Sequence, residues 1–130
     1  MCSPHFDIEK LVRRNTDAIF SHEYNCNLRR LFPWRGVAET KRQITEFGCI
    51  WVVVDPGCTV DAHDHNEEEA FIVVSGRAQV TISGQQTELG TGDVAYIPRF
   101  SPHQISNPSD TVPFVMVDIY WDNAGAMPGP

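Results

Sequence analysis

Apolar residues in the middle of the chain recur in short runs that stop at turn-forming residues. The first run lies within 43–54, is rich in β-branched and aromatic residues, and ends at Asp55-Pro56-Gly57. This composition followed by a turn predicts a strand, in which Gly48 marks a bulge or a bend. Further runs lie at 60–65, 69–75, 78–82, 93–97, 103–106 and 112–121. Short strands separated by turns about every 8–12 residues predict an all-β barrel or sandwich.

The apolar residues ahead of these runs follow a helical period instead. Ile8, Leu11 and Val12 fall on one face of a helix, with Asp7 placed to cap its N-terminus. This pattern predicts a short N-terminal helix that ends at about Phe20.

The chain is expected to divide into three parts. Residues 1–42 supply the helix and an arm that packs on the barrel, because the apolar residues within 25–36 are costly to leave in water. Residues 43–122 form the barrel itself. Residues 123–130 contain few side chains that could pack, and are expected to be a disordered tail.

Composition narrows the class of protein. A chain of 130 residues with 42% hydrophobic and 21% charged residues has the size and composition of one globular domain. Its net charge of -7 argues against a nucleic-acid partner, because such proteins concentrate Lys and Arg to neutralise phosphates. The first residues lack the pattern of a signal peptide, and no apolar run approaches the ~20 residues that span a bilayer. A cytoplasmic protein without a membrane segment is therefore expected.

The four cysteines point to the same compartment. None of them forms a Cys-x-x-Cys pair, so neither a zinc knuckle nor a disulfide framework is indicated. We expect free thiols at Cys2, Cys26, Cys49 and Cys58.

Candidate chemistry gathers in the stretch from Gly57 to Gly76. His63, His65 and Glu69 share odd numbering, so an extended backbone points all three side chains to one face. His103 lies far downstream, on a run that a folded-back strand brings over the same point. Three imidazoles and one carboxylate suit one divalent transition metal ion, and this ligand set does not choose among Fe, Mn, Ni, Co and Zn.

Two alternatives stay open at this point. A lone His-x-His is a weak signal, and a polar pocket that holds no ion has the same pattern. Glu67 and Glu68 compete with Glu69 as the carboxylate ligand, and only the spacing from His65 selects Glu69.

The two stretches resemble the two motifs of the cupin superfamily. The first matches Gly-x5-His-x-His-x3-Glu-x6-Gly at every fixed position, and the second matches Gly-x5-Pro-x-Gly-x2-His-x3-Asn except that Phe100 replaces a glycine. The resemblance implies a small jelly-roll barrel that binds one metal ion through four residues. These implied ligands are His63, His65, Glu69 and His103.

Aromatic residues near the motifs are candidates for a substrate pocket, because such pockets are mostly apolar with few polar anchors. Trp51, Phe71 and Phe100 are the candidate lining residues. Tyr96 and Tyr120 are the candidate catalytic residues, because their hydroxyls can donate to a bound substrate. Plain core packing is the alternative for each of the five.

The family does not fix the function, since cupins include dioxygenases, isomerases, lyases, decarboxylases and proteins that only bind. We hypothesise a metal-dependent enzyme acting on a polar or anionic small molecule, with a non-catalytic binding module as the alternative. Segments 28–34, 47–51 and 118–122 also resemble small cupin domains found beside methionyl-tRNA-synthetase-like enzymes in natural-product pathways. That resemblance implies a synthetase-like partner and nitrogen–nitrogen bond formation from an amino-acid-derived hydroxylamine.

Large apolar residues at the ends of the barrel segment favour self-association, because a small barrel is not expected to expose so many. We therefore expect a homodimer. The residues concerned are Leu31, Phe32, Trp34, Tyr120 and Trp121.

Overall fold

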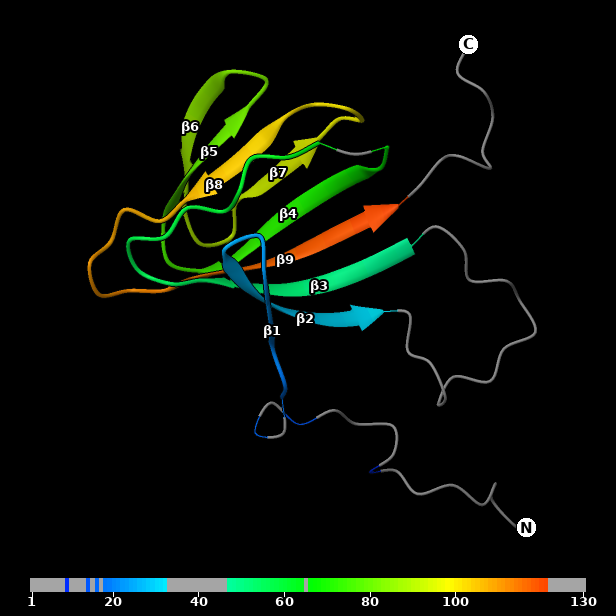
Figure 1. Ribbon diagram of the computed structural model, residues 1–130, viewed down its shortest axis with the longest axis vertical. Coiled ribbons are helices and arrows are strands. Elements are labelled where there is room, and N and C mark those ends of the chain that lie inside the picture. The colour runs from blue at the N-terminus through cyan, green and yellow to red at the C-terminus, as the bar shows by residue number, and fades with distance from the viewer. Residues whose placement is uncertain are drawn as a thin grey trace, which may run out of the picture.

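The computed structural model describes residues 9, 14, 16, 18–32, 47–64 and 66–121 of the chain. These residues contain nine strands and no α-helix (Figure 1). The strands are β1 Ser21–Glu23, β2 Cys26–Phe32, β3 Phe47–Val54, β4 Glu68–Ser75, β5 Ala78–Ile82, β6 Gln85–Leu89, β7 Val94–Ile97, β8 His103–Ser106 and β9 Phe114–Trp121.

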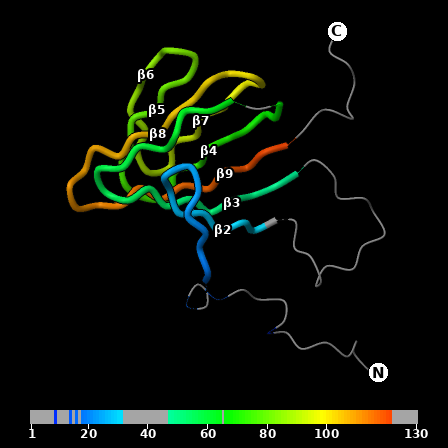
Figure 2. The backbone as a smooth tube through the Cα atoms, viewed as in Figure 1, coloured from blue at the N-terminus to red at the C-terminus, as the bar shows by residue number. Residues whose placement is uncertain are grey.

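The strands form two antiparallel sheets that face each other. The larger sheet has the order β1-β2-β3-β9-β4-β7, and the smaller has the order β6-β5-β8. Figures 1 and 2 show the smaller sheet lying over the strands β4, β9 and β3. The predicted all-β barrel is confirmed.

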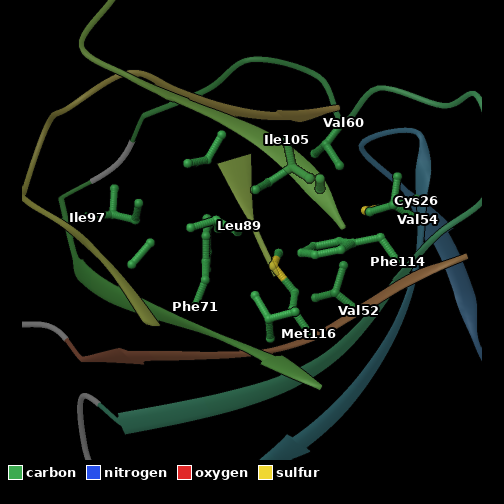
Figure 3. Close-up of a cluster of buried hydrophobic side chains, with 14 of the residues drawn as sticks. Cys26, Val52, Val54, Val60, Phe71, Leu89, Ile97, Ile105, Phe114 and Met116 are labelled. Carbon is green, nitrogen blue, oxygen red and sulfur yellow. The ribbon is translucent and has the colours of Figure 1, made fainter. Parts of the chain in front are cut away.

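The core lies between the two sheets and draws alternate residues from each (Figure 3). On β9, the buried residues Phe114, Met116 and Asp118 alternate with half-buried ones, so one face of this strand points inward. Val80 and Ile105 supply the opposite wall from β5 and β8. Full burial of a side chain of this size stabilises the folded state by roughly 1.5–3 kcal/mol. Because every second residue of a strand is buried, the apolar faces of the two sheets turn toward each other.

One predicted strand is wrong. Among the described residues 60–64, only His63 forms a bridge, with His103, and the preceding Thr59 forms another with Ser106. Between the two bridges, the amide of Asp61 donates to the carbonyl oxygen of Tyr24 at 2.9 Å instead of to β8. The ladder is interrupted there because this segment pairs with two different neighbours. Strand β6 was not predicted, since four of its five residues are polar and exposed.

The N-terminal part of the chain differs from expectation where it is described. The predicted helix from Asp7 to about Phe20 lies mostly outside the described residues, and Ala18 to Phe20 have no helical structure. β1 and β2 are strands of the larger sheet, so residues 21–32 belong to the barrel and do not form an arm packed on it. The rest of the expected arm and the expected tail, 33–46 and 123–130, lie outside the described residues.

The described cysteines Cys26, Cys49 and Cys58 are free thiols, as expected, while Cys2 is not described. Within the described ranges, no helix has the length and apolar character needed to cross a membrane.

The non-ligand positions of the two motifs hold turns. Gly57, Gly76 and Gly92 have φ of 75°, 87° and 87°, a region that residues with a Cβ rarely adopt. Phe100 stands where the family has a glycine, and its φ of 58° keeps the glycine-like turn. Asn107 is 1% exposed and donates through Nδ2 to the carbonyl oxygens of Val54 and Val112. The replaced glycine therefore leaves the backbone path before His103 intact.

Candidate functional site

A cavity of about 220 Å³ lies inside the barrel, between the inner face of the larger sheet and the segment that carries the motif histidines. The larger sheet contributes alternate residues of β2, β3, β9 and β4 to its wall. His63 and β8 close the opposite side. His63, Glu69, His103, Phe71 and Tyr120 all line this cavity.

Backbone pairing brings the two described motif histidines together. The amide of His63 donates to the carbonyl oxygen of His103 at 3.3 Å, and the reverse bond is 3.0 Å. Their rings meet edge to face with centroids 4.5 Å apart. One antiparallel bridge therefore brings the second motif next to the first, although the two are far apart in the sequence.

Hydrogen bonds to backbone carbonyls fix the tautomer of both rings. Nδ1 of His63 lies 2.7 Å from the carbonyl oxygen of Asp61, and Nδ1 of His103 lies 2.9 Å from that of Ser101. A carbonyl oxygen only accepts, so Nδ1 carries the proton in each ring. Nε2 is then the nitrogen with the metal-binding lone pair, which is the usual arrangement of a histidine ligand.

Glu69 approaches this pair from β4. Its Oε1 lies 3.2 Å from Nε2 of His103, and both side chains are 3% exposed. A carboxylate oxygen and an imidazole nitrogen at this distance are stabilised by a proton or a cation that they share. The chemistry of these donors therefore fits a divalent ion.

His65 lies outside the described residues, so the structure does not place the fourth predicted ligand. Among the described side chains alone, no three His, Cys, Asp or Glu residues form a group that could hold a metal ion. The full set of His63, His65, Glu69 and His103 therefore stays a prediction. Of the competing acids, Glu68 bonds to Tyr96 on the outside of the sheet, whereas Glu67 also lines the cavity.

Asp118 is a cavity residue that the sequence analysis missed. The pKa of Asp118 is raised to about 9. Burial is the largest cause, and a hydrogen bond with Glu69 raises the pKa further. Burial also raises the pKa of Glu69, while the bond from Asp118 lowers it. Of the two carboxyl groups, Asp118 is therefore the one that keeps a proton. The sequence did offer a signal for Asp118, because it is the one acidic residue within the apolar run 112–121.

The structure divides the five predicted aromatic residues. Phe71 and Tyr120 line the cavity, and the ring of Phe71 meets the edge of His103 with centroids 5.8 Å apart. Trp51, Tyr96 and Phe100 are not among the residues that line this cavity.

The reason for each misplaced residue is local. Trp51 follows the inward-facing Ile50 on β3, and therefore points to the other face of the sheet. Tyr96 is 51% exposed, donates a hydrogen bond to Glu68 and stacks on Trp121. Phe100 occupies a turn and is 62% exposed.

Comparison with known proteins agrees with this fold. The solved structure of the plu4264 protein from Photorhabdus luminescens superposes with a TM-score of 0.73 at 32% identity, covering 86% of this chain and 88% of that one. A Cupin 2 conserved barrel domain protein from Salinispora arenicola has a TM-score of 0.73 at 34% identity, covering 87% and 89%.

A curated relative is much longer than this chain. Mannose-1-phosphate guanylyltransferase ManC of Salmonella typhimurium is 29% identical over 115 residues, which is 87% of this chain and 23% of that protein. The chain thus spans less than two thirds of that relative. The cupin domain family model matches residues 50–120, the segment that carries both motifs and most of the cavity wall. Both barrel sheets, the paired motif histidines and this match over more than half of the 130 residues show that the chain belongs to the cupin family.

Proposed function

We propose that this cupin is a metal-dependent enzyme that acts on a polar or anionic small molecule. His63, His65, Glu69 and His103 would hold one divalent transition metal ion. The observation that carries the proposal is the fixed tautomer of His63 and His103, whose Nδ1 atoms bond to backbone carbonyls beside the buried Glu69 carboxylate. The side chains of Glu69 and His103 are each 3% exposed, and polar groups so deeply buried are costly unless they bind a ligand or each other.

The chain's own residues supply the remaining chemistry. When bound, the ion would act as a Lewis acid or lower the pKa of a coordinated water toward about 7. Phe71 and Met116 form an apolar wall that excludes bulk water and so strengthens electrostatic contacts in the cavity. Asp118 holds a proton beside Glu69, and the hydroxyl of Tyr120 lines the same space. Both groups are able to donate to a bound oxygen or nitrogen.

The reaction type stays open among dioxygenase, isomerase and lyase chemistry. A non-catalytic binding or partner-supporting module is the alternative class. Nitrogen–nitrogen bond formation beside a synthetase-like partner rests on sequence segments alone and stays a prediction.

Elemental analysis of purified variants tests the metal site. About one equivalent of transition metal per chain is expected in the wild-type protein, with a sharp loss in His63→Ala and in His103→Ala. His22→Ala is the matched control, because this histidine lies on β1, bonds to Asn27 and is not among the cavity lining residues. Full metal content in both motif variants would show that the assignment is wrong.

A second experiment separates an enzyme from a module. The metal-loaded protein is incubated with a mixture of polar metabolites, and consumption is followed by mass spectrometry. Glu69→Gln is expected to lower turnover at least about tenfold, which equals roughly 1.4 kcal/mol of barrier. Undiminished consumption by protein whose metal removal has been verified would overturn the enzyme proposal and leave the binding module.

A further inference from the structure

The larger sheet contributes an arginine to the cavity wall in addition to Glu69. Register places Arg30 of β2, Ile50 of β3, Asp118 of β9 and Phe71 of β4 in one row across the larger sheet. Residues paired in this way share a face, and all four line the cavity. β3 and β9 separate β2 from β4, so Arg30 and Glu69 start from backbones about 14 Å apart.

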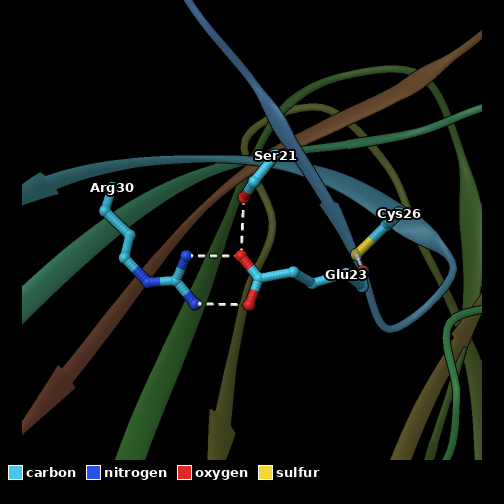
Figure 4. Close-up of polar contacts among 4 residues, drawn as sticks. All are labelled: Ser21, Glu23, Cys26 and Arg30. Carbon is cyan, nitrogen blue, oxygen red and sulfur yellow. Dashed lines mark hydrogen bonds and ion pairs between the residues drawn. The ribbon is translucent and has the colours of Figure 1, made fainter.

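The guanidinium of Arg30 forms a partly exposed ion pair with the carboxylate of Glu23 (Figure 4). Nη1 donates to Oε2 of Glu23 at 2.6 Å, and Nη2 donates to Oε1 at 3.1 Å. The hydroxyl of Ser21 donates to Oε2 of Glu23 at 2.5 Å. The bond from Arg30 and then that from Ser21 lower the pKa of Glu23 to about 2, so the pair stays ionised at neutral pH. A planar guanidinium held in this way loses little freedom when it binds a second anion.

Tyr120 brings a hydroxyl to the same wall. A Cβ added to Gly48 would overlap the ring carbon and the hydroxyl of Tyr120, so this ring lies across the neighbouring strand β3, on the side toward β2. Burial raises the pKa of Tyr120, and the charge of Glu67 raises it further, while the charge of Arg30 lowers it. The phenol and the guanidinium therefore interact electrostatically across β3.

The charges around the cavity determine which ligand this wall suits. Among the described residues that line it, Arg30 is the single Lys or Arg, whereas Glu67, Glu69 and Asp118 are acids. A ligand with an anionic group at each end is favoured by a cation at each end of such a cavity. The proposed metal ion supplies one cation, and the guanidinium of Arg30, which is also paired with Glu23, supplies the other. The cavity volume of about 220 Å³ lies below the roughly 300–1,000 Å³ of pockets for drug-sized ligands, which indicates a small metabolite.

We propose that Arg30 and Tyr120 form a carboxylate-binding subsite. The ligand would be a small acid whose carboxylate binds the guanidinium and the phenol, while a second oxygen or nitrogen group at its other end binds the metal ion. The metal-bound end rests on the proposed function, and the Arg30 end does not. Glu23 accepts one bond from each Nη of Arg30, so the carboxylate of the ligand would exchange with Glu23 or bind beside it. Charge-assisted hydrogen bonds of this kind are roughly twice as strong as neutral ones.

Titration calorimetry with glutarate and with pentanoate tests the subsite. The two acids have equal length, but only glutarate carries a carboxylate at both ends. In the protein as purified with its metal, glutarate is expected to bind at least tenfold more tightly than pentanoate. Arg30→Gln should bring glutarate to the level of pentanoate, and Tyr120→Phe should weaken glutarate about threefold. A series from malonate to adipate would give the length that the cavity prefers.

Arg77→Gln is the matched control. Arg77 also donates to a glutamate at 2.6 Å, Glu88, but neither residue lines the cavity. This variant is expected to bind glutarate as the wild type does. Arg30→Lys, which keeps the charge and loses the fork, should show intermediate affinity, and its thermal midpoint shows whether the barrel tolerates a change at this position.

The outcomes separate this inference from the proposed function. An equal loss of glutarate affinity in Arg30→Gln and Arg77→Gln, or no loss in Arg30→Gln, would overturn the subsite. A protein that holds no metal would contradict the proposed function alone, because Arg30-dependent glutarate binding is still expected after metal removal. Loss of that dependence in the metal-free protein would overturn the subsite alone.

Discussion

The ring of Tyr120 occupies the space that a side chain at Gly48 would fill. Gly48 lies directly opposite Tyr120 in the pairing of β3 with β9. A glycine within a strand usually weakens it, so its presence here has a packing reason. The missing side chain leaves room for the ring and hydroxyl of Tyr120 over Gly48.

Gly48→Ala is therefore expected to destabilise the protein by about 1–3 kcal/mol through overpacking, instead of stabilising the strand. Thermal unfolding measures the change. In a Tyr120→Ala background the same substitution should cost less than about 0.5 kcal/mol, because the overlapping ring is gone. An equal cost in both backgrounds would show that another contact is responsible.

Phe100→Gly is expected to stabilise the protein by about 1 kcal/mol. Phe100 has a φ of 58° and is 62% exposed, so the substitution relieves backbone strain and loses little apolar burial. Differential scanning calorimetry should show a higher midpoint. Ser101→Gly is the control, since the neighbouring Ser101 is not in the left-handed region and gains nothing from glycine. A lower midpoint for Phe100→Gly would mean that its ring makes a stabilising contact.

Asn107→Ala is expected to cost about 2–4 kcal/mol. The side chain is 1% exposed, donates to two backbone carbonyls and accepts from the amide of Ser109, so truncation leaves all three backbone groups without this partner. Urea unfolding measures the loss. Asn66→Ala, in an exposed position, should change stability by less than about 0.5 kcal/mol. Similar values for both variants would contradict the role given to Asn107.

Cys26 should resist alkylation in the folded protein. Burial is the main effect that raises the pKa of its thiol to about 11, so at pH 8 only about one thiol in a thousand is ionised. Mass spectrometry after iodoacetamide treatment should find the half-buried Cys58 modified well before Cys26. In urea the two rates should converge. Equal rates in the folded state would show that the cavity opens readily.

The homodimer stays a prediction. The outer face of the larger sheet is a candidate for its interface. Trp51, Val117, Ile72 and Val94 form an apolar row across β3, β9, β4 and β7 on the face opposite the core. Light scattering should give twice the chain mass, and Val117→Lys should give a monomer, because an apolar interface does not tolerate an unpaired charge. A monomeric wild-type protein at micromolar concentration would rule the dimer out.

The sequence by itself determined the strand-rich class and the motif positions. Residues 47–54, 69–75 and 114–121 are strands because their β-branched and aromatic side chains favour a pleated, half-buried backbone. The spacing of His63, Glu69 and His103 also identified side chains that the barrel brings to one cavity. These features follow from local preference and from the period of two along a strand.

Only the tertiary structure decided which face of each strand points inward. β3 and β9 are apolar on both faces, so periodicity could not show that Tyr120 lines the cavity while Trp51 lies outside. Arg30 and Asp118 reach the same cavity because β2 pairs with β3, and β3 with β9, in one particular register. Register between strands distant in sequence is set by packing of the whole core, because a shift of one residue would turn every buried side chain outward.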